Sequence, residues 1–195
     1  MKKLILIAAP PASGKNFVSD TISKKLNHVA YFDKDDLHPL VNRLFDITGN
    51  ERNMDGAFHD EYIRDVEYET LFILCETALK YEDVVIANAP FGYQIKNYEI
   101  LKAKRKELNE KGVKLCMVWV LSNPTLCKTH MQERDAVRDR KKLENWEEYV
   151  KNINFNPPSS LIENEAIDEL MVVDNTSTDA FNNTINQVVS RIKES

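Results

Sequence analysis

The sequence of 195 residues lacks internal repeats, low-complexity tracts and any hydrophobic run near the ~20 residues that span a bilayer. Its three cysteines, Cys75, Cys116 and Cys127, are odd in number and lack metal-ligand spacing, which predicts free thiols in a reducing compartment. The 26 Lys and Arg are outnumbered by 31 Asp and Glu, and the net charge of −5 argues against a protein that coats nucleic acid. We therefore expect a cytoplasmic protein with neither membrane nor nucleic acid as its partner.

Short apolar runs alternate along the chain with longer segments of helical spacing. The apolar runs, typical of buried strands, lie at 4–8, 29–32, 84–87, 115–121 and 170–173. The helical segments lie at 15–26, about 36–47, 57–81, 94–111, 125–154 and 178–192. This alternation predicts an α/β fold of three layers, a five-stranded parallel sheet between helices, and the length fits one domain over residues 1–195. Ligands of such sheets bind beyond the carboxyl ends of the strands.

A phosphate-binding pattern follows the first apolar run. Residues 9–16 match G-x-x-x-x-G-K-[ST] at Gly14 and Lys15 but have Ala9 and Asn16 at its two ends. In this pattern backbone N–H groups hold β-phosphate oxygens and the lysine reaches the β- and γ-phosphates. The structural alternative is a tight strand-to-helix turn with an exposed lysine. Because the two prolines of the loop donate no N–H, the expected nucleotide contacts are Ala12, Ser13, Gly14, Lys15 and Asn16.

Together with the acidic run at 33–36, the loop resembles a group of small P-loop kinases with the nucleoside-monophosphate-kinase-like fold. That group includes polynucleotide 5′-hydroxyl kinases, zeta toxins and chloramphenicol phosphotransferase, and the chain looks closest to bacterial relatives described as AAA-family ATPase or zeta-toxin-like. The resemblance extends over segments 64–69, 89–91 and 138–149. It implies a kinase that uses ATP and Mg²⁺ to phosphorylate a hydroxyl of a small-molecule acceptor.

The acidic run supplies the candidate catalytic base. In the kinase group an aspartate after the second strand takes the proton of the acceptor hydroxyl, and the matching residue is Asp35. A carboxylate that orients the attacking oxygen is also what phosphoryl transfer requires. Asp33 is the second candidate, as a base or as a contact to the substrate and metal-bound water. One aspartate of the run is expected to cap a helix, and we assign that role to Asp36. The group's usual arginine is replaced here by His38, and Arg43 is a possible substitute.

Two asparagines stand where the group has hydroxyl or acidic side chains. Asn16 is the predicted metal ligand of the loop, directly or through water, although an amide is a weaker ligand than a carboxylate. Asn88 follows the third strand and is a predicted contact to the acceptor, with a turn before proline as its alternative. We therefore expect Mg²⁺ to be held mainly by ATP phosphates and water.

The resemblance implies that the segment 125–154 is a mobile lid whose arginines close over the triphosphate. Arg134, Arg138 and Lys142 recur every four residues, which on a single helix would place them near one face. Arg134 and Arg138 are the predicted catalytic contacts to phosphate, because a planar guanidinium matches phosphate oxygens. The alternative is a solvated helix whose arginines pair with neighbouring acidic residues.

The remaining predictions concern the two ends of the ligand site. Asn175, after the fifth strand, is expected to lie on the adenine side of the nucleotide, and Arg64 is expected to bind an acidic or phosphorylated acceptor. A polynucleotide or nucleotide-sugar kinase remains an alternative, against which the acidic composition and position 38 argue. A nucleotide-binding ATPase or switch without phosphotransfer is a second alternative, which Asn16 favours. We expect a monomer or a homodimer formed through segment 57–81.

Overall fold

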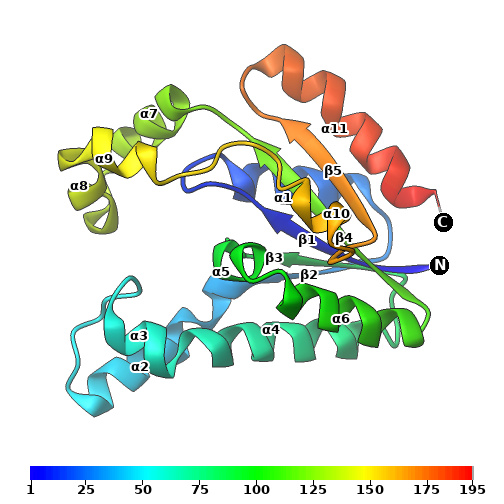
Figure 1. Ribbon diagram of the computed structural model, residues 1–195, viewed down its shortest axis with the longest axis horizontal. Helices are drawn as coiled ribbons and strands as arrows, with labels where there is room; N and C mark the ends of the chain where they lie inside the picture. The colour runs from blue at the N-terminus through cyan, green and yellow to red at the C-terminus, as the bar shows by residue number, and fades with distance from the viewer. Residues whose placement is uncertain (195) are drawn as a thin grey trace.

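The computed structural model describes residues 1–194, with the exception of the side chains of Val137 and Arg138. Its five strands form a single parallel sheet in the order β2-β3-β1-β4-β5 (Figure 1). The predicted α/β fold with a five-stranded parallel sheet is therefore confirmed. The strands are β1 (Lys2–Ala8), β2 (Val29–Asp33), β3 (Val84–Asn88), β4 (Val113–Leu121) and β5 (Glu169–Asp174).

The register of the sheet brings polar residues together at its carboxyl edge. Ile7 of the central strand β1 pairs with Asn88 of β3, and Asn88 pairs with Asp33 of the edge strand β2. Asp33 and Asn88 are the last residues of their strands, and the loop that follows β1 begins at the same edge of the sheet. Three segments distant in sequence are thereby adjacent.

Helices cover both faces of the sheet (Figure 1). Leu4, Leu6 and Ala8 of β1 pack in the core on one face, beneath α4 (Arg64–Ala78) and α6 (Glu99–Glu110). Ile5 and Ile7 pack in the core on the other face, beneath α1 (Lys15–Lys25) and α11 (Thr178–Lys193). The uninterrupted apolar run of β1 follows from its burial on both faces, because successive side chains point to opposite sides.

Several helical segments are shorter than the sequence predicts. Segment 57–81 is α3 (Ala57–Tyr62) and α4, interrupted at Ile63, and segment 94–111 is α5 (Gly92–Lys96) and α6. Segment 125–154 comprises α7 (Pro124–Arg134), α8 (Val137–Glu144) and α9 (Trp146–Lys151). Asp135 ends α7 with a φ of 42°, a left-handed conformation from which a right-handed helix cannot continue.

Two short elements and one helix complete the chain. The 3₁₀ turn η1 (Lys34–Leu37) follows β2 directly and leads into α2 (His38–Thr48), whereas α10 (Ser160–Glu163) precedes β5 and was not expected. Among the helices of residues 1–194, none combines the length and the apolar character that crossing a membrane requires.

Candidate active site

The loop between β1 and α1 has the conformation of a narrow cradle. Ala12 and Gly14 both adopt left-handed conformations, with φ of 62° and 82°. Among the described residues no side chain caps α1, so the free N–H groups of its first turn are available to an anion. An added Cβ on Gly14 would clash with Nδ2 of Asn175, so any side chain at this position would require the Asn175 side chain to move. Asn175 donates to the carbonyl of Ser13 at 2.9 Å, so the turn after β5 closes one side of the cradle.

Helix α7 supports the loop from behind. The Nδ1 of His130 donates to the carbonyl of Ala12 at 2.8 Å, because a carbonyl can only accept. The buried Ser13 hydroxyl donates to the carbonyl of Pro10 at 2.7 Å and lies 3.6 Å from the Cys127 sulfur. The contacts of His130 and Cys127 couple the cradle to the first helix of the predicted lid, and the sequence does not indicate them because they join residues more than a hundred positions apart.

Lys15, the first residue of α1, reaches the carboxyl edge of the sheet. Its Nζ donates to Oδ1 of Asn88 at 2.6 Å and to Oδ1 of Asn16 at 3.4 Å. Burial lowers the pKa of Lys15, and the charges of Asp33 and Asp35 oppose that shift. The lysine therefore lies within electrostatic range of both carboxylates predicted for the site.

Asn88 links the lysine to the acidic run. Its side chain is fully buried, and its Nδ2 donates to Oδ2 of Asp33 at 2.6 Å and to Oδ1 of Asn16 at 3.1 Å. Asn88 therefore orients the amide of Asn16 and one oxygen of Asp33 at the same time. Of the residues predicted for the site, the structure brings Lys15, Asn16, Asn88 and Asp33 into one hydrogen-bonded chain.

These residues suit a weakly held Mg²⁺ ion. Within residues 1–194, no group of three or more His, Cys, Asp or Glu side chains could hold a metal. The available oxygens belong to one carboxylate, Asp33, and to the Asn16 amide, which already accepts two hydrogen bonds. Mg²⁺ at nucleotide sites commonly keeps water and phosphate oxygens as ligands, and this donor set is compatible with such a site.

The aspartates of the acidic run have different environments. Oδ1 of Asp33 accepts a hydrogen bond from the backbone N–H of Asp35 at 2.9 Å, so Asp33 caps η1. The assignment of the cap to Asp36 was wrong, because η1 begins immediately after the strand. With Asn88 and the Tyr31 hydroxyl on its other oxygen, Asp33 has little free capacity to accept a proton. The Asp35 side chain is 46% exposed, and one oxygen lies 3.4 Å from Nε2 of His38.

Arg64 lies at the start of α4, close to the acidic run. Its Nη1 donates to Oδ1 of Asp60 at 2.8 Å, and its guanidinium carbon lies 4.5 Å from the centre of the Tyr93 ring. Burial raises the pKa of Tyr68 to about 12, with the Asp35 charge adding to the shift and the Arg64 charge opposing it. Glu67, one turn after Arg64 on α4, contacts Lys34 of the acidic run, so the structure brings the first turn of α4 to the same region as the Asp35 carboxylate.

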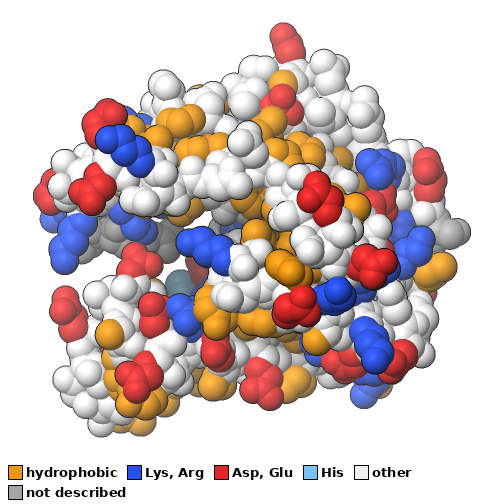
Figure 2. Space-filling model, viewed as in Figure 1, with side chains coloured by type: hydrophobic (Ala, Val, Ile, Leu, Met, Phe, Trp, Pro, Cys, Tyr) orange, Lys and Arg blue, Asp and Glu red, His pale blue; other side chains and the backbone are white. Residues whose placement is uncertain are grey.

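The two predicted phosphate-binding arginines lie on two different helices and not on a single one. Arg134 ends α7, and its Nε and Nη2 lie 2.7 and 2.6 Å from Oδ2 of the buried Asp139. Arg138 belongs to α8, so the three basic residues do not share one helix, and its side chain lies outside the described part of the structure. Lys142 of α8 forms an ion pair at 3.2 Å with Asp55, in the segment before α3. Figure 2 shows the surface hollowed between the α7–α9 region and the α2–α3 region.

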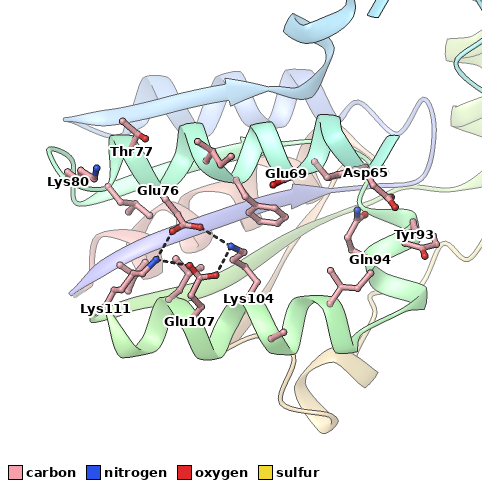
Figure 3. A pocket seen from close by; sticks show the side chains of 18 residues that line it. Asp65, Glu69, Glu76, Thr77, Lys80, Tyr93, Gln94, Lys104, Glu107 and Lys111 are labelled. Carbon is pink, nitrogen blue, oxygen red and sulfur yellow. Dashed lines mark hydrogen bonds and ion pairs between the residues drawn. The ribbon is translucent and has the colours of Figure 1, made fainter. Parts of the chain in front are cut away.

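A separate groove of about 980 Å³ lies between α4 and α6 (Figure 3). One end holds an ion-pair network in which Glu76 binds Lys104 and Lys111 at 2.8 and 2.7 Å. The described residues that line the groove include none of those predicted for the site. None of its lining residues belongs to the phosphate loop, and at its other end Tyr93 contacts the Arg64 guanidinium.

Solved structures share the fold of the chain, whereas no protein-family model and no curated protein match it. A protein of Chloroflexus aurantiacus j-10-fl assigned as a kinase is 17% identical with a TM-score of 0.62. The match covers 99% of this chain and 97% of that protein. A structure from the PezAT chromosomal toxin–antitoxin system of Streptococcus pneumoniae is 14% identical with a TM-score of 0.59, covering 100% and 88%. A sugar kinase of Janibacter sp. HTCC2649 is 12% identical with a TM-score of 0.57, covering 99% and 95%. The chain has the fold of small P-loop kinases.

Proposed function

We propose that the protein is a kinase that transfers the γ-phosphate of ATP to a hydroxyl of a small-molecule acceptor. The observation that carries this proposal is the hydrogen-bonded chain from Lys15 through Asn88 to Asp33, because it joins the phosphate loop to the acidic run at one edge of the sheet. The fold of small P-loop kinases supports it further, and two of the similar structures are kinases by name.

In this proposal the cradle residues from Ala12 to Asn16 bind the β- and γ-phosphates, and Asn175 borders the adenine side. The Lys15 ammonium would swing from the Asn88 oxygen to phosphate oxygens, while Asn88 keeps its hydrogen bond to Asp33. A Mg²⁺ ion bound to the triphosphate would neutralise part of its charge, with Asn16 and Asp33 contacting it through water.

Asp35 is the base in this mechanism. The acceptor hydroxyl loses its proton to the Asp35 carboxylate as its oxygen bonds to the γ-phosphorus, and the bond from that phosphorus to the bridging oxygen breaks to release ADP. Asp35 is favoured over Asp33 because its carboxylate is half exposed, whereas three donors occupy the oxygens of Asp33. Arg64, on the first turn of α4 near the acidic run, would bind an anionic group of the acceptor.

The segment 124–151 would act as the lid. For Arg134 to contact the triphosphate, it has to leave Asp139, and Arg138 would contact it from the adjacent helix. The ion pair between Lys142 and Asp55 already links this segment to the opposite side of the hollow seen in Figure 2. A closed lid would exclude water from the transferred phosphate.

The proposal is tested by screening hydroxylated metabolites for ADP release from MgATP above the rate without acceptor. We expect one class of small acceptor to raise ADP release, and Lys15→Ala and Asp35→Asn each to reduce that increase by about 100-fold or more. Efficient phosphorylation of 5′-hydroxyl oligonucleotides in the same assay would show that the acceptor is a polynucleotide and would contradict the small-molecule acceptor. Slow hydrolysis that no acceptor stimulates and that Asp35→Asn leaves unchanged would contradict a kinase altogether.

A further inference from the structure

A buried charged cluster includes the lysine of the acidic run and has no role in the mechanism above. It consists of Lys34 of η1, His59 of α3 and Glu67 of α4, whose exposed fractions are 8%, 5% and 3%. The Lys34 ammonium lies 3.0 Å from each oxygen of Glu67, and the Nε2 of His59 donates to one of them at 2.8 Å. We refer to these three residues as the buried triad.

The triad holds the one residue that separates the two candidate carboxylates. A 3₁₀ turn has three residues per turn, so consecutive side chains leave it in different directions. Lys34 enters the protein interior, while Asp33 hydrogen bonds to Asn88 and Asp35 is exposed towards solvent. Anchoring the Lys34 side chain therefore limits how η1 can rotate, and with it the direction of the Asp35 carboxylate.

The next residue of α4 holds the neighbouring strand end. The buried Tyr68 hydroxyl accepts a hydrogen bond at 3.1 Å from the backbone N–H of Phe91, which follows β3 in a left-handed conformation with φ of 54°. Glu67 and Tyr68 thus tie the segments after β2 and β3 to the same turn of one helix. Both segments border the site, so α4 acts as a common support for it.

Stability alone does not account for the triad. Removing charges from water is costly, and a buried ion pair is often no more stable than apolar side chains of similar volume. His59 also has a buried Nδ1 without a hydrogen-bond partner among the described residues, and Oδ1 of Asp60 lies 3.8 Å from it. An arrangement with this cost is better explained by the geometry that it imposes on η1.

We infer that Glu67, together with Lys34 and His59, is a positioning device that directs the Asp35 carboxylate towards the phosphate loop. This inference rests on the proposed kinase function and deepens it. The triad touches neither ATP nor acceptor in this account, so its loss is expected to lower kcat while leaving nucleotide binding unchanged.

The decisive variant is Glu67→Gln, which keeps the shape of the side chain and removes its charge. With the acceptor found by the screen, we expect kcat to fall about 10- to 100-fold, since a misplacement of about 1 Å can cost that much. The KM for ATP is expected to stay within about 2-fold, because the cradle does not contact Glu67. Glu76→Gln is the matched control, because Glu76 lies on the same helix and also contacts two basic side chains, Lys104 and Lys111 (Figure 3), and it should leave kcat unchanged.

A double-mutant cycle separates positioning from general damage. If Glu67 acts through Asp35, Glu67→Gln causes no further loss in an Asp35→Asn background, whereas independent effects would multiply. Lys34→Met combined with Glu67→Met guards against misfolding, because it removes both charges together. We expect this variant to fold, with an unfolding temperature below that of the wild type because the buried His59 N–H loses its acceptor, and still to show the reduced kcat.

Hydrogen–deuterium exchange gives a readout that needs no acceptor. Glu67→Gln is expected to increase exchange in residues 33–38 and to leave residues 12–16 at the wild-type rate. Unchanged exchange in residues 33–38 would overturn the positioning inference and leave the proposed function intact. The same holds if the wild type is active and its Glu67→Gln variant keeps the wild-type kcat. A wild-type protein that binds ATP but phosphorylates no acceptor would instead refute the proposed function, and the positioning role would fall with it.

Discussion

Replacing Gly14 by alanine tests the cradle through protein stability alone. The backbone at this position has φ of +82°, which costs a residue with a Cβ roughly 1–2 kcal/mol. The new Cβ would also lie 2.4 Å from Nδ2 of Asn175, so the Asn175 side chain has to move and its hydrogen bond to Ser13 is lost, at about 1 kcal/mol. We therefore expect Gly14→Ala to lower the free energy of unfolding by about 2–3 kcal/mol.

Urea denaturation of a small set of variants can separate these two contributions. In an Asn175→Ala background the clash is absent, so Gly14→Ala should cost only the backbone strain of roughly 1–2 kcal/mol. Gly92→Ala is the control, because its Cβ meets nothing within 4 Å, and it should change stability by less than about 0.5 kcal/mol. A Gly14→Ala protein as stable as wild type would refute the described loop conformation.

Three further results are expected. Asp35→Asn should reduce kcat for phosphotransfer by about 10²–10⁴-fold with unchanged ATP affinity, as measured by single-turnover kinetics and calorimetry, and a larger loss in Asp33→Asn would exchange their roles. Tyr68→Phe leaves the buried N–H of Phe91 without its acceptor and should cost about 1–3 kcal/mol in urea denaturation; a neutral effect would contradict this contact. Burial raises the pKa of the Cys75 thiol to about 12, so at pH 8 it should react with a disulfide reagent only upon unfolding, and rapid labelling of the native protein would contradict its burial.

The sheet was predictable from the sequence because each strand is a short, mainly apolar run. All five predicted runs form strands, and the central strands β1, β3 and β4 are buried along nearly their whole length, as an uninterrupted apolar run predicts. Helix interruptions were not predictable. Ile63 interrupts an apolar pattern without glycine or proline, and Asp135 adopts a left-handed conformation that its residue type permits but does not require.

The site residues that follow or end a strand were predictable from the sequence. Lys15 and Asn88 each follow or end a strand, so their meeting at one edge is a consequence of parallel strands. The buried triad was not predictable, because Lys34 stands within an acidic run, where a lysine is ordinarily solvated. Its partner Glu67 lies 33 residues further along, on a helix whose orientation only the folded structure defines.

The most direct test of the account is the binding of MgATP to wild-type protein and to Lys15→Ala, measured by calorimetry. We predict saturable binding of one ATP per chain and at least a 10-fold weaker affinity for the variant, since the half-buried ammonium proposed to bind the triphosphate is lost. Absence of ATP binding by a folded wild-type protein, or equal affinity for both proteins, would contradict the central claim that this loop binds a nucleotide.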